Sequence, residues 1–179
     1  MNEKIIAALK NEIEAIDAET GKKIYCKDDC RAWKRGDTFT LDSAKFAYFD
    51  FDNDGSHELA AEFDGAVYVF REYEGEVYSY RLTAPDCLSI NSNGYFYWQA
   101  FGGQIDYGYY RITFEGTTLR THDVCSVSCY ETQFESWLVN GEYVDNWTGE
   151  GYFSSMYAPS PKFLTYEEIL SEKNGADKC

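Results

Sequence analysis

Residues 67–82 read VYVFREYEGEVYSYRL, and this stretch decides which kind of fold the chain can adopt. Apolar and polar residues alternate on both sides of Glu74-Gly75, which is the pattern of two half-buried strands that turn one face to a core. Glycine in the connecting pair permits the positive φ that a tight hairpin turn requires. The stretch therefore predicts an antiparallel β-hairpin.

Two further stretches follow the same plan. Residues 109–124, YYRITFEGTTLRTHDV, turn at a Glu-Gly pair, and residues 136–147, SWLVNGEYVDNW, turn at an Asn-Gly pair. Asn-Gly between two alternating runs is the strongest short hairpin signal. Successive hairpins predict an antiparallel β-meander, and we expect this sheet to span residues 45–147.

A helix is predicted near each end of the chain. Close to the N-terminus, apolar residues recur at three- and four-residue spacing with Glu and Lys between them, which is typical of an amphipathic helix packed on a sheet. The apolar series is Ile5, Leu9, Ile13 and Ile16. We expect this helix within residues 1–21. Thr165 and Glu168 form a capping box, which predicts a short C-terminal helix over residues 165–174.

These patterns together predict a β-rich α+β fold, an antiparallel meander with one helix near each end. The chain has 179 residues, which is enough to bury a sizeable core, and we expect a single domain over residues 1–179. Aromatic residues make up 18% of the chain, and flat rings pack well on the pleated surface of a sheet. Composition and hydropathy pattern therefore favour the same fold class.

The charge balance excludes some partners. The chain carries 31 acidic and 16 basic residues, a formal net charge of −15, which opposes binding to nucleic acid because phosphate backbones attract Lys and Arg. The first residues, 1–17, place a short apolar run between acidic residues, so we expect no membrane insertion. We expect a cytoplasmic protein if Met1 is the native start and an extracellular protein if a leader was removed.

The most unusual segment is residues 50–58, which read DFDNDGSHE inside a strand-like region. Its carboxylates are Asp50, Asp52, Asp54 and Glu58. Four carboxylates this close repel one another unless a cation lies between them. Ca²⁺ binds six to eight oxygens, and alternate side chains on a tightly turning loop can converge on one such ion. We expect a Ca²⁺ site, with Mg²⁺ and an ion-free acidic turn as the alternatives that stay open.

This segment resembles the calcium loops of FG-GAP/VCBS-type repeats and of bacterial extracellular or lipoprotein domains with a single such loop. The shared pattern is a hydrophobic residue, one residue of any type and then DxDxDGxxEL, and the resemblance covers residues 46–59 and extends through the following hairpin to Leu82. It implies a calcium site between two strands. The implied ligands are Asp50, Asp52, Asp54, the backbone carbonyl of Ser56, and Glu58.

A binding or scaffolding role without catalysis is the function we expect, with the ion fixing a loop. The sequence has no P-loop, no G-x-S-x-G or H-E-x-x-H motif and no dinucleotide fingerprint. A carboxylate-dependent hydrolase is an alternative because acidic residues are abundant, although the sequence singles out no catalytic pair. An acidic protein that docks on a basic partner protein is a further alternative.

Aromatic residues suggest one more alternative, a carbohydrate- or peptide-binding module. Tyr and Trp combine a flat apolar body with a polar tip, and such rings stack on sugar faces when they are exposed. The candidate residues are Trp98, Tyr107, Tyr109, Trp137 and Trp147. Burial in the core is the competing interpretation for each of them.

The six cysteines permit disulfides without requiring them. Cys125 and Cys129 lie in an alternating, strand-like run, where residues four apart are separated by about 13 Å. A disulfide needs a much shorter Cα separation, so we expect no bond between these two thiols.

Overall fold

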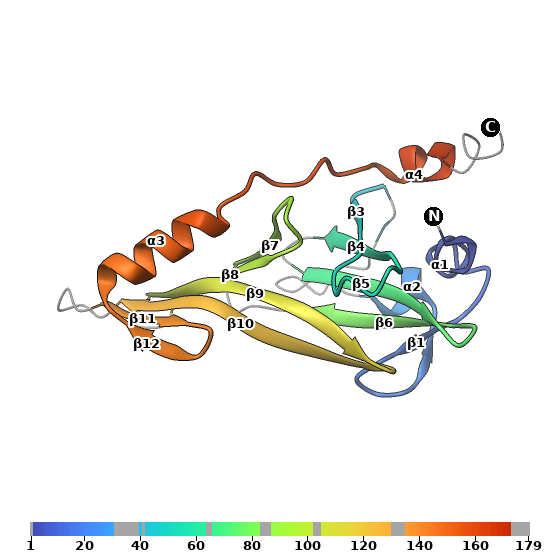
Figure 1. Ribbon diagram of the computed structural model, residues 1–179. Coiled ribbons are helices and arrows are strands. Elements are labelled where there is room, and N and C mark those ends of the chain that lie inside the picture. Colours follow the sequence, from blue (N-terminus) through green and yellow to red (C-terminus); the bar gives the residue numbers. More distant parts are fainter. Residues whose placement is uncertain are drawn as a thin grey trace. The chain divides into compact units, whose positions relative to one another are not determined.

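Within the residues that the computed structural model describes, the strands form two six-stranded sheets (Figure 1). The described residues are 2–30, 40, 42–63, 66–82, 87–101, 105–129 and 135–172. Strands predominate over helices, which confirms the β-rich α+β class. None of the helices in this described part of the chain has the length and apolar character to cross a membrane.

The chain divides into two compact units, each built around one of the sheets. The first unit comprises Met1–Thr83, Gly116–Thr118 and Lys162–Cys179, and the second comprises Ala84–Glu115 and Leu119–Pro161. The single domain expected over residues 1–179 stays a prediction.

The sheet of the first unit has the strand order β2-β1-β6-β5-β4-β3. Its four later strands are consecutive and antiparallel, whereas β1 lies parallel to β6. The strands are β1 (Ala15–Asp17), β2 (Lys23–Ile24), β3 (Lys45–Phe49), β4 (Glu58–Phe63), β5 (Ala66–Tyr73) and β6 (Glu76–Leu82). Three short helices accompany them: α1 (Glu3–Leu9), α2 (Cys26–Asp29) and α4 (Tyr166–Glu172).

Helix α1 supplies part of the core of this unit because its apolar residues lie on one side. Ile5 and Leu9 are buried together with Phe46 of β3, Leu59 of β4 and Phe70 of β5. Alternation along the strands places these three residues on the covered face of the sheet. The core therefore forms directly behind strands β3 and β4, which carry the acidic loop between them.

The N-terminal helix is shorter than the range of 1–21 that the sequence predicts. It ends at Leu9, and Asn11 adopts a positive φ of 62°, a left-handed conformation that ends a helix. Ile16, which fits the helical series, instead lies in β1 opposite Tyr78 of β6. Pairing there satisfies the backbone groups along the edge of β6 that a helix would leave open.

The C-terminal helix begins with the capping box that the sequence predicts. The Thr165 backbone N–H donates to the Glu168 carboxylate at 2.8 Å, and the Glu168 N–H donates to the Thr165 hydroxyl at 3.2 Å. Helix α4 is described as far as Glu172. The last two positions of the predicted range 165–174 lie outside the described residues.

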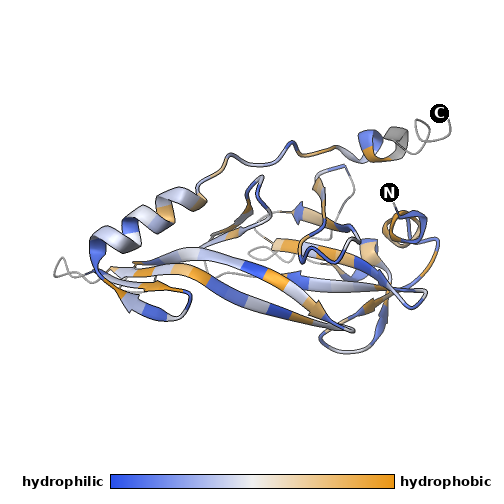
Figure 2. Cartoon of the chain, viewed as in Figure 1, coloured by the Kyte–Doolittle hydropathy of each residue, from blue (hydrophilic) through white to orange (hydrophobic). Residues whose placement is uncertain are grey.

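The sheet of the second unit has its strands in chain order, from β7 to β12. They are β7 (Cys87–Ile90), β8 (Phe96–Phe101), β9 (Ile105–Glu115), β10 (Thr118–Cys129), β11 (Glu135–Val139) and β12 (Glu142–Val144). Figure 2 shows both hydrophilic and hydrophobic residues along β9 and β10; in β10 the exposed residues 120–123 precede the buried Val124 and Cys125. The antiparallel order predicted for residues 45–147 is thus divided between two sheets.

Helix α3 (Asn146–Met156) covers part of this second sheet and contacts β9 and β11. Trp137 of β11 is 3% exposed beneath it. Cys125 and Cys129 both lie in β10, and both are free thiols. The helix approaches the sheet closely because a glycine, Gly149, faces the Trp137 ring.

Substituting Gly149 with alanine is expected to destabilise the protein by about 1–3 kcal/mol, because the new methyl group overpacks the contact with Trp137. A Cβ at Gly149 would lie 2.4 Å from Trp137 Cγ, and the buried indole has little room to move. Denaturant unfolding followed by tryptophan fluorescence measures the loss.

Gly151→Ala is the matched control on the same helix, since a Cβ at Gly151 meets no atom within 4 Å. Alanine has the higher helix propensity, so this variant should be neutral or stabilised by up to about 1 kcal/mol. Equal effects at Gly149 and Gly151 would contradict the close packing of α3 on Trp137.

Candidate functional site

The acidic segment forms the connection between β3 and β4 in the first unit. Phe49 at the end of β3 pairs with Glu58 at the start of β4, so residues 50–57 close an antiparallel hairpin. Asp50 follows β3 directly, and Glu58 is itself a strand residue. The loop is therefore fixed at both ends by backbone hydrogen bonds of the sheet.

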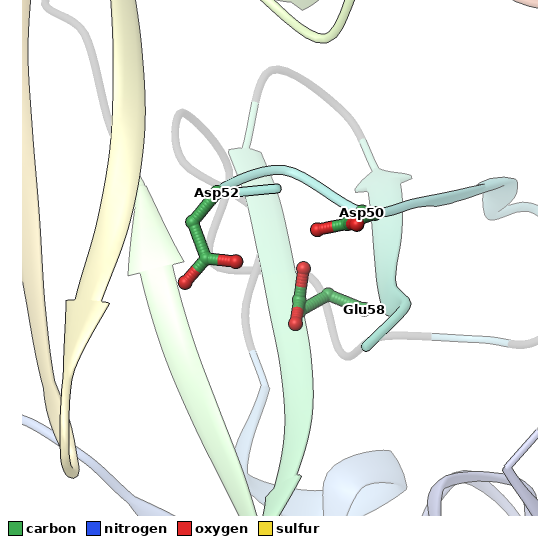
Figure 3. A group of neighbouring side chains, drawn as sticks. All are labelled: Asp50, Asp52 and Glu58. Carbon is green, nitrogen blue, oxygen red and sulfur yellow. The ribbon is translucent and has the colours of Figure 1, made fainter. Parts of the chain in front are cut away.

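Three carboxylates converge at this loop. Asp50, Asp52 and Glu58 each offer an oxygen, and these oxygens lie within 4.8 Å of one another; Figure 3 shows the three side chains pointing toward a common space. Calcium–oxygen distances of 2.3–2.6 Å place two ligands on opposite sides of an ion roughly 4.6–5.2 Å apart. The three oxygens are therefore close enough to hold one metal ion of this size.

Backbone hydrogen bonds hold the loop in its turned shape. The Asp50 carboxylate accepts from the N–H groups of Asp54 and Gly55, both at 3.0 Å, and Asp52 accepts from Asp54 at 3.2 Å. Asn53 and Gly55 adopt positive φ values of 60° and 90°, which Asn and Gly tolerate better than other residues. The sequence of the loop thus supplies both the acceptors and the turn residues that bring the carboxylates together.

Glu58 is the buried member of the cluster, with no exposed surface. Its Oε2 accepts the Phe51 N–H at 3.1 Å, while its Oε1 has no hydrogen bond and lies 3.6 Å from Arg71 Nε. Burial raises the pKa of Glu58 to about 7, and repulsion from Asp52 and Asp54 adds to this rise. A buried carboxylate oxygen without a hydrogen bond is costly, and a bound cation removes that cost.

Arg71 contacts two carboxylates of the acidic segment, and the sequence patterns did not single it out. It lies in β5, one position beyond the Leu59–Phe70 pair between β4 and β5, which places it beside Glu58. Only 8% of its surface is exposed. An arginine that interrupts the apolar run of a strand is the signal that could have found it, because a buried charge requires a partner.

The guanidinium of Arg71 also fixes Asp54 and a distant turn. Its Nη2 donates to Asp54 Oδ2 at 2.7 Å, and its Nη1 donates to the Gly116 carbonyl at 3.1 Å. The Ser56 N–H donates to the other Asp54 oxygen at 2.7 Å. Partial burial acts to raise the pKa of Asp54, but the bonds from Ser56 and Arg71 outweigh it and hold this pKa below its usual range.

The structure thus brings three of the five predicted ligands together, namely Asp50, Asp52 and Glu58. Asp54 belongs to the same loop, but its carboxylate is engaged by Arg71 and by the backbone of Ser56. Ser56 itself is exposed. The donor set of three carboxylates suits a hard cation, which prefers oxygen ligands.

Three of the five candidate aromatic residues gather on one face of the second sheet. The Tyr107 ring lies 6.5 Å from that of Trp137, and Phe153 of α3 packs against Tyr107 and Tyr109 at centroid distances of 5.4 and 4.8 Å. Helix α3 buries Trp137 and leaves Tyr107 partly exposed. Trp137 therefore serves the core of this unit.

The other two candidates lie elsewhere. Trp98 pairs with Gly108, whereas the neighbouring Tyr97 pairs with Tyr109, so Trp98 is on the opposite face of the sheet from these tyrosines. Trp147, near the start of α3, is 86% exposed. The five residues do not form one patch.

Comparisons of the chain with protein-family models, with curated proteins and with solved structures gave no match. What the site does must therefore be inferred from its own residues.

Proposed function

We propose that the protein is a calcium-binding, non-catalytic β-domain in which Asp50, Asp52 and Glu58 hold the ion. The observation that carries this proposal is the convergence of three carboxylate oxygens within 4.8 Å, one of them from a fully buried glutamate. Ca²⁺ neutralises their mutual repulsion and coordinates the buried carboxylate in addition to its ion pair with Arg71. Further oxygens, waters among them, complete its coordination.

The ion has a structural role in this proposal. The loop joins β3 to β4, and these strands carry Phe46 and Leu59 of the core behind it. Fixing the loop therefore supports the antiparallel strands β3–β6 and the helix packed on them, which we infer to be the frame of a binding or scaffolding domain. The resemblance of residues 46–59 to FG-GAP/VCBS-type calcium loops agrees with this role.

Calcium fits the cluster better than magnesium. Mg²⁺ requires ligands at 2.0–2.1 Å in a near-ideal octahedron and usually keeps several waters, with only one or two carboxylates bound. Three carboxylates whose positions are set by a hairpin and by backbone hydrogen bonds suit the longer and more flexible coordination of Ca²⁺.

A hydrolase is the less favoured function for the same residues. Glycosidase carboxyl groups stand on two sides of a bond, roughly 5–9.5 Å apart, with room for a sugar between them. Here three oxygens lie within 4.8 Å, and Arg71 fills the space beside Glu58. The arrangement resembles a site for one ion more than a catalytic pair.

Calcium is expected to raise the melting temperature of the protein, and chelator is expected to lower it. Ligand at a hundred times its Kd stabilises a folded protein by about 2.7 kcal/mol if the unfolded chain does not bind it. Thermal melts and titration calorimetry, with Ca²⁺ and Mg²⁺ in parallel, measure the effect and the ion preference.

Asp52→Asn should abolish the calcium-dependent part of the stability, because it removes one charged ligand and keeps the shape of the side chain. Glu142→Gln, at an exposed position in β12, is the control and should leave the calcium response unchanged. Identical melts in Ca²⁺ and in chelator, together with no heat of binding, would show that the loop holds no ion.

A further inference from the structure

The second unit contains a pocket whose lining includes no residue of the acidic loop. Its volume is about 380 Å³, at the small end of the range of roughly 300–1,000 Å³ typical of small-molecule sites. Strands β7, β8 and β9 line it, together with α3 and the chain that follows this helix. The aromatic residues around it are Tyr97, Tyr107, Tyr109, Phe153 and Tyr157.

The aromatic wall follows from the register of β8 and β9. Tyr97 lies opposite Tyr109, and Tyr107 is two residues before Tyr109, so all three rings are on the same face of the sheet. The Tyr97 and Tyr109 rings are 5.5 Å apart between centroids. Phe153 of α3 packs against Tyr107 and Tyr109 and closes one side of the wall.

A buried asparagine, Asn91, joins the chain after β7 to the end of α3. Asn91 is 5% exposed, and its Nδ2 donates to the carbonyl of Met156 at the end of α3 at 2.9 Å. Its Oδ1 accepts the N–H groups of Asn93 and Tyr95 at 3.0 and 3.1 Å. The Ser92 N–H donates to the carbonyl of Pro159 at 2.8 Å. These hydrogen bonds hold the chain after β7 against the end of α3 and the segment that follows it, so this part of the lining is preformed.

The lining is polar without being charged. Of the described residues around the pocket, none carries an ionised side chain, and the polar groups are Tyr and Ser hydroxyls and the Asn91 amide. Burial raises the pKa of Tyr107 to about 12 and also raises that of Tyr109, so both phenols stay protonated and can donate hydrogen bonds. A charged ligand would lose its hydration here without gaining a counter-charge.

We propose that this pocket binds a neutral sugar ring. A pyranose presents an apolar C–H face, which stacks on Tyr rings, and a rim of hydroxyls, which pairs with neutral donors and acceptors of the kind present here. Ser89 and Ser160 lie at the lining beside the tyrosines and suit that rim.

This proposal does not depend on the calcium site, because it rests on residues of the other unit. It also separates the roles of the candidate aromatic residues. Tyr107 and Tyr109 contact the sugar, whereas Trp98, Trp137 and Trp147 are not part of the lining among the described residues.

The probes are four neutral trisaccharides: maltotriose, cellotriose, xylotriose and N-acetylated chitotriose. Ligand-observed NMR and calorimetry on the full chain should detect saturable binding of at least one of them. Tri-galacturonic acid, which carries carboxylates, should bind at least about tenfold more weakly because the lining offers no cation. No saturable binding of any trisaccharide at several millimolar, or equal binding of the charged one, would overturn the proposal.

Tyr157→Ala and Trp147→Ala form a matched pair for locating the site, since both side chains are largely exposed, at 75% and 86%, and neither is expected to disturb folding. Only Tyr157 lines the pocket. Its loss should weaken sugar binding by about tenfold, as expected for one ring contact, while Trp147→Ala keeps the affinity. The reverse pattern, or tighter binding of a proline-rich peptide than of every sugar, would also overturn the proposal.

Discussion

Replacing Arg71 with methionine is expected to destabilise the calcium-free protein by about 3–5 kcal/mol, the cost of removing one partner from a buried ion pair. Glu58 has no exposed surface, and Arg71 is 8% exposed, so solvent cannot replace the lost guanidinium. Asp54 and the Gly116 carbonyl lose their Arg71 hydrogen bonds as well. Chemical denaturation in chelator at about pH 8, where Glu58 is ionised, measures the full loss.

The same substitution is expected to strengthen calcium binding. Arg71 places a positive charge 3.6 Å from Glu58 Oε1, and this charge opposes a cation at the same carboxylates. Its removal should tighten the Kd for Ca²⁺ by roughly tenfold. Stability without calcium and affinity for calcium therefore change in opposite directions, which a general folding defect would not produce.

Arg120→Met is the control for both measurements. Arg120 also pairs with a glutamate, Glu115, at 3.2 Å, but the two side chains are 57% and 69% exposed. Exposed pairs of this kind contribute about 0–1 kcal/mol, so this variant should keep its stability and its calcium affinity. Equal losses in the two variants, or weaker calcium binding after Arg71→Met, would contradict the role given to Arg71.

The turns of the fold could be predicted from the sequence because their chemistry is local. Glu74-Gly75 and Asn140-Gly141 both adopt positive φ at each position, and each pair joins two adjacent antiparallel strands. The same locality holds for the acidic loop, where Asn53 and Gly55 take the left-handed conformation. The conformation of such a turn depends on the residue types within it, so it can be predicted without knowing any distant contact.

The partners of the strands could not be predicted in the same way. Ile16 fits a helical series, yet it pairs in parallel with Tyr78, a residue far along the chain. Periodicity indicates which face of an element is apolar, but it does not state what covers that face. For the same reason, the sequence pattern does not show that the predicted meander is divided into two sheets, because each hairpin carries the same local pattern.

At the candidate site too, the sequence pattern does not show which distant residue each carboxylate contacts. The spacing of the acidic loop proposes five ligands, but it does not reveal that Asp54 meets Arg71 across the sheet. That contact joins residues 17 positions apart, and it depends on the register between β4 and β5. Which carboxylates are free to converge is therefore a property of the folded sheet and not of the loop sequence.

Glu58 is expected to make the calcium-free protein less stable as the pH rises. Burial raises the pKa of Glu58 from an ordinary 4.5 to about 7, so the folded chain holds this proton more tightly than the unfolded chain does. The stability that protonated Glu58 contributes is fully present below about pH 4.5, the pKa in the unfolded chain. It decreases as the pH rises and is lost above about pH 7, the pKa in the folded chain. At about 1.36 kcal/mol per pKa unit, the loss amounts to about 3 kcal/mol.

Bound calcium should suppress this pH dependence, because the ion takes the place of the proton at Glu58. Glu58→Gln isolates the effect: other carboxylates titrate in both proteins, so they cancel in the difference between the two curves of unfolding free energy against pH. Arg71 keeps Asp54 and the Gly116 carbonyl as partners in this variant.

In chelator at about pH 8, Glu58→Gln should therefore be more stable than the parent by about 3 kcal/mol, with the two proteins equal near pH 4. In calcium the order should reverse, since the glutamine lacks the charge that holds the ion. A difference curve that is flat with pH in chelator would mean that Glu58 is not the buried, proton-binding ligand described here.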